Sequence, residues 1–157
     1  MALNTLIIGD SSARVWGMSG AERLRRQLAE IKDAVEIMQL EGLADEESVL
    51  LLRGDHLFDP RLLCALTETG DDMVLVTGYG GAPVAARVHA KLARAARADL
   101  AGQGAGAGVA ALKCRTPSEL VEGFQKSLRK NEPPHLFAIA GTNTAELELE
   151  LFGGAYK

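Results

Sequence analysis

The fold class of this chain is indicated most clearly by the stretch Ser48-Val-Leu-Leu-Leu-Arg-Gly-Asp-His-Leu-Phe-Asp-Pro60. Four consecutive apolar residues, Val49 to Leu52, predict a strand inside a parallel sheet that is covered on both faces. Asp59 and Pro60 suit a helix N-cap and a first helical position, so a helix follows. Asp55 is therefore expected at the carboxyl end of a central strand. Ligands of open α/β sheets bind at that edge, where a carboxylate is suited to hold Mg²⁺ beside a nucleotide phosphate.

Strands and helices alternate along the rest of the chain. The residue periodicities predict strands over 3–8, 34–40, 49–53, 73–77, 109–113 and 136–140, and helices over 21–31, 60–68 and 116–130. Two of the helices open with capping boxes, Ser19-Gly-Ala-Glu22 and Thr116-Pro-Ser-Glu119. This alternation predicts the α/β class, with a single three-layer αβα domain built on a mainly parallel sheet.

For three segments the sequence pattern allows more than one interpretation. Val84 to Arg87 forms either a further strand or the start of an Ala-rich helix that runs to about Leu100, because so short a run does not separate the two periodicities. Residues 145–152 alternate Glu and Leu as a strand does, but the cap residues before them and the two glycines after them favour a helix. Residues 102–108 have the composition of a surface loop. A phosphate-binding loop is disfavoured there, because no Lys-Ser/Thr pair follows.

The composition excludes several classes of protein. A chain of 157 residues, 47% hydrophobic and 24% charged, can bury a core without metal or disulfide staples. Its net charge of −4 argues against nucleic acid as the main partner. No apolar segment approaches the ~20 residues that span a bilayer, and no signal-peptide pattern is present. Cys64 and Cys114 lack metal-ligand spacing, so both are expected to be reduced core thiols in a cytosolic protein.

A basic stripe is expected on the Ala-rich helix. One face of that helix would carry Arg87, Lys91, Arg94 and Ala98, and the core face would carry Val84, Val88, Leu92 and Ala95. The basic face is either an ordinary solvated surface or a contact for an anionic membrane surface.

Two segments resemble a known family. They are Ala21-Glu-Arg-Leu-Arg-Arg-Gln-Leu28, which follows the first expected strand, and Leu52-Arg-Gly-Asp-His-Leu-Phe-Asp-Pro60. This arrangement resembles the core of sugar-phosphate nucleotidyltransferases, including inositol-phosphate cytidylyltransferases. The resemblance implies a shortened nucleotidyltransferase-like (GT-A or Rossmann-like) fold, in which Asp55 matches an aspartate that helps to bind the catalytic Mg²⁺.

Three further segments, which together with the region between them span most of the chain, carry a more specific resemblance. They are Val15-Trp-Gly-Met-Ser-Gly-Ala-Glu-Arg-Leu-Arg-Arg-Gln-Leu28, Leu128-Arg-Lys-Asn-Glu-Pro-Pro134 and Leu151-Phe-Gly-Gly-Ala-Tyr-Lys157. All three resemble the region that precedes the membrane domain in bacterial CDP-alcohol phosphatidyltransferase proteins. The resemblance implies that residues 1–157 are one domain, followed by a transmembrane transferase domain as its partner. It also implies a homodimer as a further partner, the cytoplasmic face of the inner membrane as the location, and phospholipid biosynthesis as the process.

The resemblance further implies a nucleotide site. Its candidate residues are Asp10, Ser11, Arg14 and His56, with Asp55 as the metal ligand. The implied ligands are Mg²⁺ and CTP or a CDP-alcohol. Asp55 and His56 fit equally well a structural role in the turn after the strand.

This chain departs from the family at two places. The loop Gly9-Asp-Ser-Ser-Ala-Arg-Val-Trp16 has one glycine and an acidic side chain where the family has a Gly-rich loop on the nucleotide phosphates. Ile139-Ala-Gly-Thr142 lacks the family's second metal-binding aspartate. We therefore expect a catalytically degenerate domain with a regulatory, dimerisation or positioning role. The alternatives are an active Mg²⁺-dependent cytidylyltransferase that makes a CDP-alcohol, and a generic α/β protein-interaction domain.

Overall fold

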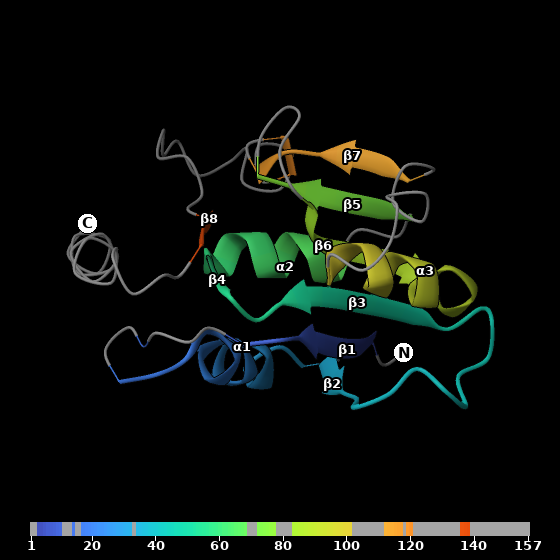
Figure 1. Cartoon of the computed structure of the whole chain (residues 1–157), viewed down its shortest axis with the longest axis horizontal. Helices are drawn as coiled ribbons and strands as arrows, with labels where there is room; N and C mark the ends of the chain where they lie inside the picture. Colours follow the sequence, from blue (N-terminus) through green and yellow to red (C-terminus); the bar gives the residue numbers. More distant parts are fainter. Residues whose placement is uncertain are drawn as a thin grey trace.

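The computed structural model describes residues 3–10, 14, 17–32, 34–68, 72–77, 83–101, 112–117, 119–120 and 136–138. The elements in chain order are β1 (Leu3–Ile8), α1 (Gly20–Ala29), β2 (Ala34–Glu36), β3 (Ser48–Arg53), β4 (His56–Phe58), α2 (Pro60–Glu68), β5 (Met73–Val76), β6 (Pro83–His89), α3 (Ala90–Leu100), β7 (Lys113–Arg115) and β8 (Leu136–Ala138). Figure 1 shows the main strands stacked from β2 at the bottom of the view to β7 at the top.

In the described part of the chain, six strands form one sheet in the order β2-β1-β3-β6-β5-β7. The pairs β1–β2, β1–β3 and β5–β7 are parallel, whereas β6 runs antiparallel to both of its neighbours. The expected mainly parallel α/β sheet is therefore confirmed, with β6 as the reversed strand. A second, two-stranded sheet pairs β4 with β8 in antiparallel orientation.

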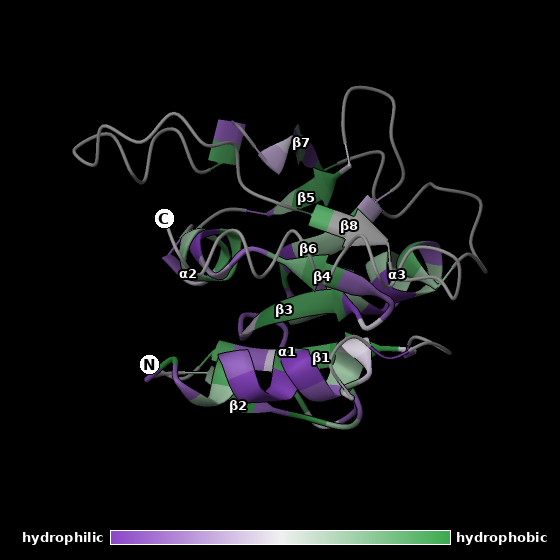
Figure 2. Ribbon diagram, turned by 90° about the vertical axis from the view of Figure 1, so that its left-hand side faces the viewer, coloured by the Kyte–Doolittle hydropathy of each residue, from purple (hydrophilic) through white to green (hydrophobic). Residues whose placement is uncertain are grey.

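The side chains of β3 explain why this strand is apolar throughout. Leu50 and Leu52 are fully buried in the cluster that contains the apolar faces of α1 and α2. Val49 and Leu51 are fully buried in a second cluster with the apolar face of α3. Because successive side chains of a strand point to opposite faces, the sheet forms the middle of three layers. Figure 2 shows α2 and α3 on opposite sides of the strands.

The start of α1 is confirmed as a capped helix end. Ser19 is the N-cap, and its Oγ accepts the backbone N–H of Glu22 at 3.3 Å. Leu24 and Leu28 lie on the buried face of α1, four residues apart. At the second capping box both reciprocal hydrogen bonds are present: Thr116 Oγ1 accepts the N–H of Glu119 at 3.4 Å, and the Glu119 carboxylate accepts the N–H of Thr116 at 3.0 Å.

The structure resolves the open segment at Val84 in favour of a strand, and α3 begins only at Ala90. Arg87 therefore lies in β6, and its expected place on a basic helical face is wrong. Its guanidinium donates hydrogen bonds to the carbonyl oxygens of Leu66 and Thr67 at the end of α2.

The later start of α3 also changes which residues face the core. Ala93, Ala96 and Leu100 are buried, and Leu92 is half-buried against the same cluster, as expected for Leu92. Ala95 is exposed, so its expected place on the core face is wrong. Lys91 and Arg94 are exposed, as expected.

Other boundaries differ by a few residues. β2 stops at Glu36 rather than residue 40, because it is an edge strand that pairs only with Leu3–Thr5 of β1. β7 ends at Arg115 instead of residue 113, in register with β5.

Cys114 lies exposed on β7, so the expectation of a core thiol is wrong for Cys114.

Several expectations lie outside the described residues: the loop at 102–108, the body of the helix to residue 130, the end of the last strand at 139–140, and the helix at 145–152. Among the helices that the structure describes, none combines the length and the apolar character needed to cross a bilayer.

Candidate functional site

A pocket of about 560 Å³ lies where β1 and β3 end. Its wall combines the end of β1, the end of β3 and the second half of α3. Five charged side chains line it: Asp10, Arg53, Asp55, Arg94 and Arg97. The volume lies within the range of small-molecule sites, and the position is the carboxyl edge that α/β folds use for ligands.

A close backbone approach brings the ends of β1 and β3 together. The N–H of Gly54 donates to the carbonyl oxygen of Ile8 at 2.8 Å. A Cβ atom on Gly54 would overlap the carbonyl oxygen of Gly9, so only glycine fits this position. Gly9 has a φ of +71°, which turns the chain from β1 toward Asp10. These two glycines place Asp10 and Asp55 on one pocket wall.

Asp55 is held by two neighbours. Its Oδ2 accepts a hydrogen bond from Arg53 Nη2 at 2.7 Å, and its Oδ1 lies 2.6 Å from His56 Nδ1. Burial raises the pKa of the Asp55 carboxyl, but the hydrogen bonds from His56 and Arg53 outweigh burial, and the pKa lies below its usual value. Asp55 is therefore an ionised carboxylate, and both of its oxygens already have a partner.

His56 lies behind Asp55 and does not line the pocket. Its side chain is buried, and its backbone pairs with Ala138 across the small sheet. The imidazole contacts Asp55 from the side of β4. This placement fits a residue that orients the carboxylate.

Asp10 lines the pocket and also contacts the first turn of α1. Its Oδ1 accepts the backbone N–H of Ala21 at 3.1 Å, in the first turn of that helix. A carboxylate is favourable there because the helix N-terminus carries a partial positive charge. Asp10 therefore links the end of β1 to the start of α1.

Arg14 does not line the pocket, although it is a candidate for nucleotide binding. It is exposed, forms an ion pair with Glu22 at 3.2 Å and donates to the carbonyl oxygen of Gly17 at 2.9 Å. Ser11 lies outside the described residues. Of the candidate site residues, the structure brings Asp10 and Asp55 into one pocket.

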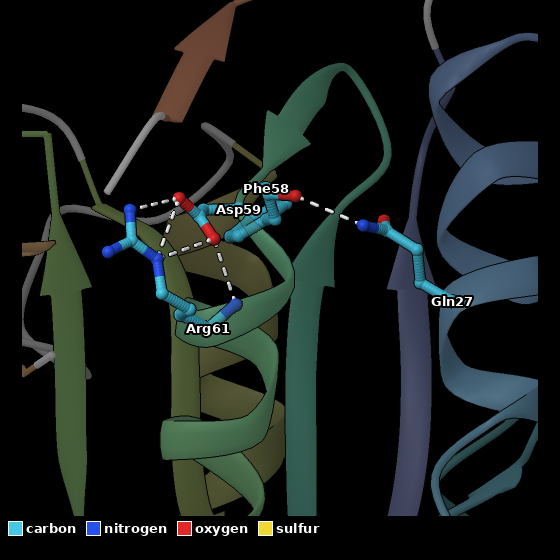
Figure 3. A network of polar contacts seen from close by, with 4 residues as sticks. All are labelled: Gln27, Phe58, Asp59 and Arg61. Atoms are coloured by element: carbon cyan, nitrogen blue, oxygen red, sulfur yellow. Dashed lines mark hydrogen bonds and ion pairs between the residues drawn. The ribbon is translucent and has the colours of Figure 1, made fainter. Parts of the chain in front are cut away.

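A second polar network fixes the chain just after Asp55 (Figure 3). The Asp59 carboxylate accepts the backbone N–H of Arg61 at 2.9 Å and its guanidinium at 2.8 Å. From α1, Gln27 Nε2 donates to the carbonyl oxygen of Phe58 at 3.1 Å. Asp59 is buried and lines no part of the pocket, so its part is to start α2, while the Gln27 contact holds the end of β4.

Arg94 and Arg97 are pocket residues that the sequence did not assign to the nucleotide site, although Arg94 was expected on the basic face of the helix. β6 runs opposite to β3, so α3 returns along the sheet and its second half reaches the carboxyl edge. Both arginines are exposed, and neither guanidinium forms a hydrogen bond or ion pair with another residue of the described ranges. The available signal was their spacing of three residues, which places them on one side of a helix.

The charge balance of the pocket favours an anion. Three guanidinium groups face two carboxylates, a surplus of one positive charge in a chain whose net charge is −4. Within the residues that the structure covers, no three His, Cys, Asp or Glu side chains gather as metal ligands. A metal ion at Asp55 would share the carboxylate with Arg53 and His56 and lie beside further cations. The positive surplus among the described pocket residues suits a phosphate group.

No protein-family model and no curated protein sequence matches the chain. The fold and the pocket define it as a three-layer α/β domain with an arginine-lined pocket at the carboxyl edge of its sheet.

Proposed function

We propose that this chain is a degenerate nucleotidyltransferase-like domain that serves a CDP-alcohol phosphatidyltransferase in phospholipid biosynthesis. It binds the phosphate groups of CTP, CDP or a CDP-alcohol and does not transfer a nucleotide itself. Its role is to regulate or position a membrane-embedded transferase domain at the cytoplasmic face of the membrane. The observation that carries the proposal is Asp55, which lines an arginine-rich pocket with both carboxylate oxygens bonded within the chain.

Nucleotidyl transfer needs charge neutralisation at the reacting phosphorus, and Mg²⁺ sites share one or two carboxylates with the substrate phosphates. Here the matching carboxylate is engaged by Arg53 and His56. Asp10, the other carboxylate of the pocket, accepts a hydrogen bond from the first turn of α1. These contacts support nucleotide binding without metal-dependent chemistry.

Two assays on the purified chain test the proposal. Calorimetric titration with CTP and with CDP measures binding, with inorganic phosphate as the comparison ligand. Release of pyrophosphate from CTP in the presence of Mg²⁺ and phosphoalcohols measures transfer. The proposal predicts tighter binding of the cytidine nucleotides than of phosphate, and no release of pyrophosphate. Absence of nucleotide binding at millimolar concentration would overturn the proposal and favour a protein-interaction domain.

An active Mg²⁺-dependent cytidylyltransferase is the second candidate. The observation in its favour is that two carboxylates, Asp10 and Asp55, line the same pocket. This candidate requires binding of CTP to depend on Mg²⁺ and to be lost in Asp55→Ala. Pyrophosphate release that is also lost in Asp55→Ala would establish it.

A further inference from the structure

We infer that Arg94 and Arg97 of α3, together with Arg53 of β3, form a metal-independent phosphate site in which Asp55 competes with the ligand for Arg53. The inference rests on the proposed function, because it names the groups that hold the nucleotide phosphate. It also makes a claim of its own: α3 supplies the phosphate contacts, and the carboxylate of Asp55 opposes binding.

The two helix arginines supply the main positive charge of the proposed site. Arg94 and Arg97 line the pocket from one side of α3. Their guanidinium groups have no hydrogen bond or ion pair with any residue that the structure describes. A planar guanidinium donates paired hydrogen bonds to phosphate oxygens, so two such groups three residues apart suit one phosphate.

Arg53 lines the pocket from the end of β3, across from α3. Its Nη2 lies 2.7 Å from Asp55 Oδ2, and its side chain is 32% exposed, so water and ligands reach it. A phosphate held by the helix arginines would offer oxygens to Arg53 in place of the Asp55 carboxylate. Without a ligand, the Asp55 carboxylate therefore occupies the place on Arg53 that a phosphate would take. Removal of the Asp55 charge should strengthen binding of an anion.

This reverses the expectation for a metal site. If Asp55 held Mg²⁺ for a nucleotide, its loss would abolish binding. If Asp55 competes with the phosphate, its loss improves binding. A single substitution that preserves shape, Asp55→Asn, therefore separates the two accounts by the sign of its effect.

The ligand chemistry is a phosphate group, and a lipid headgroup could supply one as well as a nucleotide. Lys91 provides the matched control. It is exposed on α3 and does not line the pocket, so Lys91→Gln removes one positive charge from the same helix without changing the pocket.

The experiment titrates inorganic phosphate and CDP into the full chain by calorimetry, with EDTA present throughout. The variants are Arg94→Gln/Arg97→Gln, Arg94→Lys/Arg97→Lys, Asp55→Asn and Lys91→Gln. We expect the double glutamine variant to bind CDP at least about tenfold more weakly, and the double lysine variant to recover part of that loss. Asp55→Asn should bind about threefold more tightly, and Lys91→Gln should match the original chain. Unchanged melting temperatures confirm that the exposed substitutions leave the fold intact.

Three results would overturn the inference. They are loss of binding in EDTA, loss of binding in Asp55→Asn, and an equal effect of Lys91→Gln and of the helix arginines. CDP binding that does not need Arg94 and Arg97 would leave the proposed function standing while the inference fails. Phosphate binding through these arginines without any preference for cytidine nucleotides would support the inference while the proposed function fails.

A parallel experiment measures binding of the chain to phosphatidylglycerol vesicles by sedimentation, with phosphatidylcholine vesicles as the neutral control. Binding to the anionic vesicles that the double glutamine variant loses and Lys91→Gln retains would support the site, with a lipid as the source of the phosphate. Vesicle binding that Lys91→Gln weakens to the same degree would instead assign it to the whole face of α3 and overturn a pocket site for lipid.

Discussion

The backbone N–H of Gly54 donates to the carbonyl oxygen of Ile8 at 2.8 Å, and this contact joins the ends of β1 and β3 at the rim of the pocket. There is no space for a Cβ atom at Gly54, because the Gly9 carbonyl oxygen occupies it. The relative position of Asp10 and Asp55 therefore depends on a glycine that carries no chemistry.

Gly54→Ala should lower the free energy of unfolding by about 3 kcal/mol, because the backbone must move to admit the methyl group. Gly9→Ala is the comparison. Gly9 has open space where a Cβ atom would lie but a φ of +71°, so the expected loss is smaller, about 1–2 kcal/mol. Urea unfolding of both variants measures the difference. Equal losses would contradict the close approach.

Asp59→Asn should destabilise the chain by about 2 kcal/mol, because it removes the charge of a buried carboxylate that is paired with Arg61. Glu36→Gln is the matched control, because Glu36 forms a more exposed ion pair with Arg25 at 2.8 Å. Such surface pairs contribute less than about 1 kcal/mol. Chemical denaturation measures both variants, and a control as destabilised as Asp59→Asn would argue against the network in Figure 3 as an anchor of α2.

Arg87→Ala should destabilise the chain by about 1–2 kcal/mol, because it leaves the carbonyl oxygens of Leu66 and Thr67 without their donor. Lys91→Ala removes a nearby positive charge from an exposed position, with an expected change within about 0.5 kcal/mol. Thermal unfolding compares the two. If both variants melt at the temperature of the original chain, Arg87 does not secure the end of α2.

The stability contributed by Asp55 should depend on pH. Its pKa is lowered in the folded chain, so the folded state favours the ionised form. The contribution is present above the pKa of the unfolded carboxyl, near about 4, and is lost as the pH falls through the lower folded pKa. The stability difference between the original chain and Asp55→Asn should therefore be constant near neutral pH and shrink below pH ~4. Unfolding curves between neutral and acidic pH measure it, and a difference that grows on acidification would contradict the direction of the shift.

The sequence predicted the elements whose signals are local. Leu3–Ile8 and Pro60–Glu68 have the observed limits, because an apolar run and an Asp-Pro start define them without help from the rest of the chain. Val49 to Leu52 correctly indicated a strand buried on both faces. These residues carry their structural information within a few positions.

The α3 region required tertiary information. Whether Arg87 belongs to a strand or a helix depends on pairing with Leu50 and Met73, which are remote in sequence. A boundary at Ala90 instead of Val84 changes which residues face the core. For that reason Arg94 was expected only on a basic surface and Arg97 was not named, although Asp55 was placed correctly just after the carboxyl end of its strand.

The most direct test of the central claim is a calorimetric titration of CDP into the chain, run once with Mg²⁺ and once with EDTA. CDP should bind in both, with affinities that agree within about threefold, because arginines rather than a metal hold the phosphate. Binding that appears only with Mg²⁺ and disappears in Asp55→Ala would contradict the account and identify a metal-dependent nucleotide site.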